Sequence, residues 1–141
     1  MKSSILYDTS ICIDFLREGK WAELQKSMNR DLFFSLVVFQ ELFSGAQDQF
    51  TLKGLTHLYH TAKKNDLLVC PQEEHWIECG KVIAKIAKKF GFESIGRSRL
   101  VNDVLIALSC ISIDAVLITT NKKDFARIAE FCSLEWREPL P

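Results

Sequence analysis

The stretch SSILYDTSICIDFLR, residues 3–17, contains the pattern that decides the fold. Its apolar run Ser3–Tyr7 stops at Asp8-Thr9-Ser10, and Ile11–Arg17 then carries apolar residues at helical spacing. A short apolar strand followed directly by an amphipathic helix is the repeating unit of an α/β protein. The stretch therefore predicts a buried strand that ends at an acidic residue.

The same alternation of short apolar strands and helices continues along the chain. Further strands are expected at Leu32–Ser35, Leu67–Cys70 and Ala115–Thr119, with Cys132–Leu134 as a last edge strand. Helices are expected at Trp21–Met28, Leu36–Ser44, 48–65, Gln72–Phe90, Leu100–Ile111 and Lys122–Glu130, with Phe92–Arg99 as a loop. This order predicts a single α/β domain, residues 1–141, with a mainly parallel central sheet covered on both faces.

Composition excludes several classes of protein. The chain has 141 residues, of which 48% are hydrophobic and 26% charged, so it is too apolar to be disordered. Its 18 basic and 18 acidic residues balance, so a nucleic-acid partner has to be argued from local charge. The longest uncharged run, Val104–Ile113, is far shorter than the ~20 residues of a membrane span, so no membrane segment is expected.

The five cysteines predict a reducing compartment. Their number is odd and no pair has the C-x-x-C spacing, so we interpret them as reduced thiols of a cytoplasmic protein. Cys70, His75 and Cys79 match no standard zinc spacing, which disfavours a zinc site.

Four acidic residues stand on an apolar background, where an isolated charge is costly. Asp8 and Asp124 follow predicted strands, Glu41 interrupts an apolar helix, and Asp103 begins the most apolar helix. Taken one at a time, the positions of Asp8, Asp103 and Asp124 are also explained by helix capping or by a favourable interaction with a helix dipole. Neither explanation applies to Glu41, which lies too far inside its helix. Taken together, the four favour one cluster at the carboxyl edge of the sheet.

Such a cluster predicts a metal-dependent hydrolase. Carboxylates that lie close together raise one another's pKa unless a cation compensates them, and a set of oxygen ligands suits Mg²⁺ or Mn²⁺. A divalent ion of this kind activates a water molecule and binds phosphate oxygens, which is the chemistry of phosphodiester hydrolysis. His57, His60 and His75 have no matching Ser or Cys motif, and no phosphate-binding glycine loop is present.

Local charge favours a phosphate-rich substrate. Between residues 81 and 99 there are six basic residues and one acidic residue. Lys81, Lys85 and Lys88 share one helix face, which is either a solvated surface or a contact for an RNA backbone. Arg97 and Arg99 stand just before Asp103, so these two arginines and Lys85 are the candidate RNA-binding residues.

Four pieces of sequence, in this order, resemble the PIN-domain ribonucleases, and more narrowly the VapC-type toxins of toxin–antitoxin pairs. They are Tyr7–Arg17, Glu41 in its apolar helix, Asn102–Ala107 and Leu117–Phe125. The resemblance covers essentially the whole chain. It implies a three-layer α/β/α sandwich with an acidic pocket that binds Mg²⁺ or Mn²⁺.

The resemblance also implies roles for the acids. Asp8 and Asp103 correspond to metal ligands, and Glu41 holds a metal ion or orients the attacking water. Many relatives carry Asp where this chain has Asn121, so Asp124 either supplies the missing charge of a fourth catalytic acid or caps its helix.

The resemblance also places the hydroxyls of Thr9 and Thr119 and the amide of Asn121 near the acidic cluster. These three groups would support the metal ligands or contact a phosphate. The implied protein is a homodimer that hydrolyses RNA with a metal-activated water and is neutralised by a cognate antitoxin. The neutral Asn121 keeps a second hypothesis open, a catalytically weak module that retains antitoxin and RNA binding. A phosphatase or receiver is disfavoured, since Ser10 stands where a phosphatase needs its second Asp.

Overall fold

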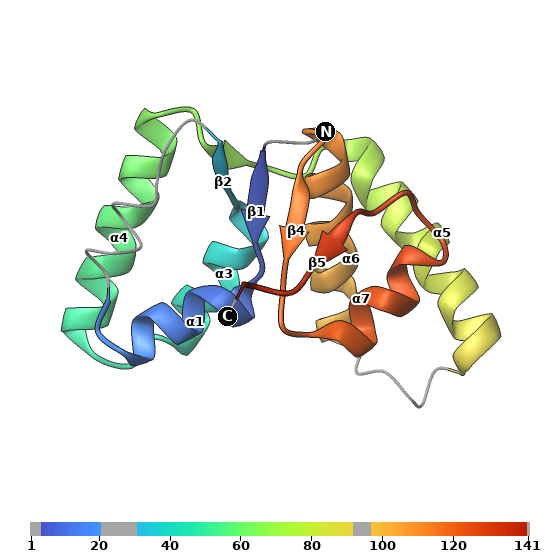
Figure 1. Cartoon of the computed structure of the whole chain (residues 1–141), viewed down its shortest axis with the longest axis horizontal. Helices are drawn as coiled ribbons and strands as arrows, with labels where there is room; N and C mark the ends of the chain where they lie inside the picture. The colour runs from blue at the N-terminus through green and yellow to red at the C-terminus, as the bar shows by residue number, and fades with distance from the viewer. Residues whose placement is uncertain (1–3, 21–30, 92–96, 141) are drawn as a thin grey trace.

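A five-stranded parallel sheet forms the centre of the computed structural model, which describes residues 4–20, 31–91 and 97–140 (Figure 1). The strand order is β3-β2-β1-β4-β5, and each neighbouring pair is parallel. The strands are β1 (Ile5–Tyr7), β2 (Leu32–Ser35), β3 (Leu68–Val69), β4 (Val116–Ile118) and β5 (Trp136–Arg137).

Six helices are present in the described part of the chain. They are α1 (Thr9–Arg17), α3 (Leu36–Gly45), α4 (Gln49–Lys64), α5 (Glu73–Phe90), α6 (Arg97–Ser112) and α7 (Lys122–Ala129). Figure 1 shows α1, α3 and α4 on the β2 side of the molecule and α5, α6 and α7 on the β4 side.

Alternate residues of β4 face two separate apolar clusters. Leu117 belongs to the main core together with residues of α3, α5 and α6. Val116 and Ile118 pack instead with Ile11, a residue of α1, and with Phe15. Because neighbouring residues of a strand point to opposite faces, the sheet has helices on both faces. The expected three-layer α/β/α fold with a parallel central sheet is therefore confirmed.

The parallel arrangement brings the carboxyl ends of β1, β2 and β4 to one edge of the sheet. Tyr7 pairs with Ile118, and the Asp8 amide donates to the Ile118 carbonyl at 3.0 Å. The junction after β1 therefore lies beside the turn after β4. At the end of β2, Ser35 caps α3 as expected, because its hydroxyl accepts a hydrogen bond from the Val37 amide at 3.1 Å.

Some boundaries differ from the sequence-based expectation. The last strand is Trp136–Arg137 and not Cys132–Leu134, because pairing with Leu117 and Ile118 fixes its position. The expected loop Phe92–Arg99 is wrong at its end, since α6 already begins at Arg97. The helix expected at Trp21–Met28 lies outside the described residues.

Two further expectations concern the chain as a whole. The structure describes all five cysteines, and none of them is joined to another by a disulfide. Across the segments that the structure describes, no helix combines the length and the apolar character that crossing a bilayer requires.

Candidate active site

Four elements carry the acidic residues singled out in the sequence. Asp8 follows β1, Glu41 lies in α3, Asp103 in α6 and Asp124 in the first turn of α7. Asp8 and Asp103 are buried, with 4% and 5% of their surface exposed, whereas Glu41 and Asp124 are half-buried. Burial raises the pKa of Asp103, and the charges of the other three acids raise it further, so all four carboxylates act on one region of the molecule.

The Asp8 carboxylate is held by two hydroxyl groups. Asp8 occupies the residue before α1, yet its side chain makes no capping hydrogen bond to that helix. Its Oδ2 atom instead accepts hydrogen bonds from Thr119 Oγ1 at 2.7 Å and from Ser10 Oγ at 3.1 Å. Thr119 is fully buried. Capping therefore does not explain this acid, whose charge is compensated by side chains from α1 and the end of β4.

Glu41 is held in the same manner by the neighbouring residue of α1. Thr9 Oγ1 donates a hydrogen bond to Glu41 Oε1 at 2.7 Å, although the two residues are 32 positions apart. Because Thr9 directly follows Asp8, the start of α1 links the acid of β1 to the acid of α3. One oxygen of each carboxylate is thus used for a fixed hydrogen bond.

Asp103 lies in a different environment. It stands beyond the first turn of α6, so the helix-dipole explanation does not hold for it. Its Oδ2 atom is buried and has no hydrogen-bond partner among the described residues. Burial, followed by the charges of Asp8, Glu41 and Asp124, raises the pKa of Asp103 to about 8, against a smaller lowering by Arg99.

Asn121 and Asp124 occupy the turn after β4. The Asn121 amide nitrogen Nδ2 donates to Asp124 Oδ2 at 3.2 Å, and the Asn121 backbone N–H donates to Thr119 Oγ1 at 3.0 Å. Arg99 Nε lies 4.0 Å from Asp124 Oδ2. Asp124 therefore has a favourable place in the first turn of α7 and also contributes its charge to the site.

The donor set fits a hard divalent cation. The unpartnered Oδ2 atom of Asp103 is buried among further carboxylates, a state that a cation would relieve. In residues 4–20, 31–91 and 97–140, no three acidic, histidine or cysteine side chains are already gathered into a complete ligand set. The acids are near enough to interact electrostatically, but they do not form a preassembled cage.

The expected RNA-binding residues are less closely tied to the acids. Arg99 is 69% exposed and, through Asp124, is next to the acidic region. Lys85 is exposed on α5. Arg97 begins α6, but its side chain lies outside the described part of the structure.

One cysteine, Cys12, lies close enough to Asp8 for the two groups to interact electrostatically. Cys12 is fully buried, and burial together with the charge of Asp8 raises the pKa of its thiol to about 12. Its sulfur thus stays protonated near neutral pH. Among the described residues, Cys70, His75 and Cys79 are not gathered into a metal-binding group. His75 Nδ1 accepts a hydrogen bond from the Gln72 backbone N–H, and Cys79 is buried.

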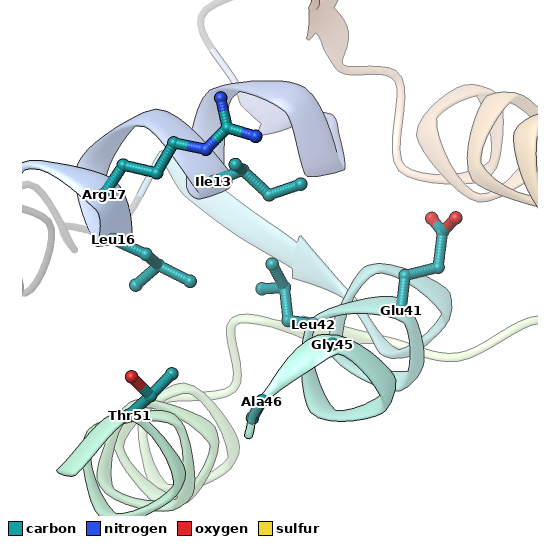
Figure 2. A pocket seen from close by; sticks show the side chains of 8 residues that line it. All are labelled: Ile13, Leu16, Arg17, Glu41, Leu42, Gly45, Ala46 and Thr51. Atoms are coloured by element: carbon teal, nitrogen blue, oxygen red, sulfur yellow. The ribbon is translucent and has the colours of Figure 1, made fainter. Parts of the chain in front are cut away.

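A pocket of about 390 Å³ adjoins Glu41, between α1, α3 and α4 (Figure 2). Leu16 and Leu42 point into its middle in this view, while Arg17 and Glu41 extend their charged ends on one side. The residues that line it are Ile13, Leu16, Arg17, Glu41, Leu42, Gly45, Ala46 and Thr51. The candidate site is therefore continuous with an apolar hollow.

Sequence reasoning missed two parts of this region. The sequence-based prediction assigns Ser10 no role in the site, although a hydroxyl two residues after a strand-terminal Asp is a signal for contact with that acid. Ile13, Leu16 and Arg17 recur at three- and four-residue spacing on one face of α1, which signals a shared surface but does not reveal a hollow.

Comparison with known proteins identifies the family. The PIN domain profile matches residues 5–131, while no curated protein matches the chain significantly. The solved structure of VapBC-1 from nontypeable Haemophilus influenzae is 27% identical, with a TM-score of 0.64 over 95% of this chain and 96% of that chain. DNA-bound VapBC from Salmonella typhimurium is 18% identical, with a TM-score of 0.68 over 98% of both chains.

A third structure agrees in fold. VapBC2 from Rickettsia felis, bound to a DNA fragment from its promoter, is 20% identical, with a TM-score of 0.64 over 96% of this chain and 98% of that chain. The resemblance to VapC-type PIN proteins that the sequence suggested is thus confirmed. The chain belongs to the PIN-domain family, whose members are nucleases.

Proposed function

We propose that this chain is a divalent-metal-dependent endoribonuclease of the VapC type. The observation that carries the proposal is the buried Asp103 carboxylate, which lacks a hydrogen-bond partner and lies within the electrostatic reach of Asp8, Glu41 and Asp124. Membership of the PIN-domain family supports nuclease chemistry at this edge of the sheet.

The proposed role of each acid depends on which of its carboxylate oxygens is not already hydrogen-bonded. Asp103 would hold Mg²⁺ or Mn²⁺ with Oδ2, and Asp8 with the oxygen that Thr119 and Ser10 do not occupy. When bound, such an ion lowers the pKa of a water molecule and neutralises charge on a phosphate oxygen. Glu41, whose Oε1 is already fixed by Thr9, would use its other oxygen to bind the ion or to orient the attacking water.

The remaining groups lie where a nucleic-acid backbone would enter. Asn121 forms hydrogen bonds with Asp124 and with Thr119, and so holds Asp124 next to the turn after β4. The negative charge of Asp124 would then assist metal binding beside the Asn121 side-chain amide, which binds a metal ion weakly. Arg99 is exposed next to Asp124, and we assign it, with Lys85 and Arg97, to contacts with RNA phosphates.

A direct test is cleavage of a labelled random-sequence single-stranded RNA by the purified protein, with Mg²⁺ or with EDTA. We expect cleavage only with the metal, and a loss of roughly 1,000-fold in Asp103→Asn, because ligand removal costs several kcal/mol of transition-state stabilisation. Asp66→Asn is the matched control, since Asp66 precedes β3 with φ 56°, a conformation that Asn tolerates. Full metal-dependent cleavage by Asp103→Asn would refute the site.

The same experiment addresses the second candidate, a catalytically weak binding module. Asn121 favours that candidate, since a neutral amide stands where the family resemblance implies an acid. RNA binding without cleavage, in protein that takes up Mn²⁺, would support the binding module over the nuclease.

We also propose that a cognate antitoxin binds the pocket of Figure 2, in keeping with the toxin–antitoxin complexes that the fold resembles. Its apolar floor beside Arg17 and Glu41 suits a peptide with an apolar anchor and mixed charges. Ala46→Phe would fill the pocket, so we expect it to abolish co-purification with the antitoxin while RNA cleavage persists. Unchanged co-purification would exclude this surface.

A homodimer and a cytoplasmic location complete the proposal. The mass of the purified protein in solution, measured by light scattering, tests the dimer. Cysteines that form no disulfide support this location, and fractionation of the host cell tests it.

A further inference from the structure

The hydroxyl of Ser10 connects two parts of the candidate site that are distant in the sequence. Its Oγ donates a hydrogen bond to Asp8 Oδ2 at 3.1 Å and accepts one from the Thr120 backbone N–H at 3.3 Å. Ser10 lies in the first turn of α1, whereas Thr120 follows β4, 110 residues later. One side chain thus joins the junction after β1 to the turn that carries Asn121.

Thr119 contacts the same carboxylate oxygen from the other side. Asp8 Oδ2 accepts a hydrogen bond from Thr119 Oγ1 at 2.7 Å in addition to the one from Ser10. Two donors on separate elements fix both the position of this oxygen and the rotation of the carboxylate about its last bond. The second oxygen of Asp8 then keeps a fixed direction as well.

A purely local role does not account for Ser10. Short hydroxyl–carboxylate contacts often belong to turns at the start of a helix. Here the side chain of Asp8 caps no amide of α1, and the bond that Ser10 accepts comes from a turn distant in the sequence. The contact therefore serves the arrangement of Asp8 relative to β4 and not the start of α1.

We propose that Ser10 is a positioning residue for the metal ligand Asp8, an inference that rests on the proposed function. Ser10 touches neither the ion nor the substrate in this account. It limits the rotation of the Asp8 carboxylate, so that less freedom is lost when the ion binds. Removal of such a supporting hydrogen bond weakens metal binding by about 10- to 100-fold. Because Thr119 remains, we expect about 10-fold for Ser10.

The test is calorimetric titration of Mn²⁺ into the full-length chain without RNA. Ser10→Ala should bind Mn²⁺ about 10-fold more weakly than the unmodified chain, and Ser10→Thr, which retains the hydroxyl, should restore the affinity. Ser112→Ala is the matched control, because it removes a hydroxyl that donates to the Ser109 carbonyl in the last turn of α6. If Ser10→Ala does not fold, Ser10→Cys keeps the shape and weakens the donor.

The outcomes separate this inference from the proposed function. A chain that binds no Mn²⁺ overturns the proposed function and the role of Ser10 with it. Normal binding by the unmodified chain and by Ser10→Ala overturns the role of Ser10 alone. An equal loss in Ser10→Ala and Ser112→Ala, or no restoration in Ser10→Thr, shows a general structural effect and also overturns it.

Discussion

The two buried carboxylates of the candidate site, Asp8 and Asp103, differ in how their charge is compensated. Asp8 accepts hydrogen bonds from Thr119 and Ser10, whereas Asp103 has a buried oxygen without a partner. Both are almost equally buried, and their charges interact. Burial alone therefore does not show how the charge of an acid is compensated. Asp8 keeps one oxygen free of these donors, whereas the buried Oδ2 of Asp103 has no donor at all and would gain most from a bound cation.

The largest expected effect concerns the pH dependence of stability without metal. The folded state raises the pKa of Asp103 to about 8, above its ordinary value of 3.8, so it binds this proton more tightly than the unfolded chain. The free energy of unfolding should therefore fall between about pH 4 and 8, by at most about 1.4 kcal/mol per pH unit from this group. Urea denaturation of Asp103→Asn should show a flatter profile, and an equal slope in both proteins would contradict the assignment.

A divalent ion should reverse this loss of stability. Mg²⁺ at 100 times its dissociation constant stabilises a protein that binds it only when folded by about 2.7 kcal/mol. We expect a higher melting temperature with Mg²⁺ near pH 8 for the unmodified chain, and little change for Asp103→Asn. An equal rise in both proteins would mean that the ion binds elsewhere.

The hydrogen bonds of Asp8 should have a smaller, structural effect. Thr119→Val keeps the shape of the side chain but removes the donor to Asp8 and the acceptor for the Asn121 backbone N–H. We expect a loss of about 2 kcal/mol in the free energy of unfolding. Thr56→Val is the control, because its exposed hydroxyl donates only to the Leu52 carbonyl in its own helix. Similar losses in both variants would show that the Asp8 contact has no special value.

Arg99 should matter least for stability. Its guanidinium is 69% exposed and lies 4.0 Å from Asp124, so Arg99→Gln should change the free energy of unfolding by no more than about 0.5 kcal/mol. Binding of RNA to the metal-free chain should weaken, and the slope of log K against log salt concentration should become shallower by about 1. Unchanged salt dependence would remove Arg99 from the substrate surface.

The sequence predicted features correctly where a residue's environment depends on the residues next to it in the chain. The strand Leu32–Ser35 and the cap at Ser35 were predicted because a hydroxyl stands between an apolar run and a helix. The candidate acids stood out because each interrupts or ends an apolar segment. Their assignment as catalytic residues is still a prediction.

Features that depend on distant contacts escaped prediction. The position of β5 is set by pairing with β4, and its two residues carry too little pattern to locate it. The bond from the Thr120 backbone N–H to Ser10 Oγ needs β1 and β4 side by side, since the two residues are 110 positions apart. The family resemblance implied support from Thr119 but none from Ser10. The contrast between Asp8 and Asp103 also depends on distant contacts, because the sequence does not show which acid will lie beside a hydrogen-bond donor.

The most direct measurement is a crystal structure of the chain with Mn²⁺, located by its anomalous scattering. The account predicts an ion bonded to Asp103 Oδ2 and to the Asp8 oxygen that Thr119 and Ser10 leave free. An ion bound elsewhere, with Asp103 Oδ2 still without a partner in protein that cleaves RNA, would contradict it.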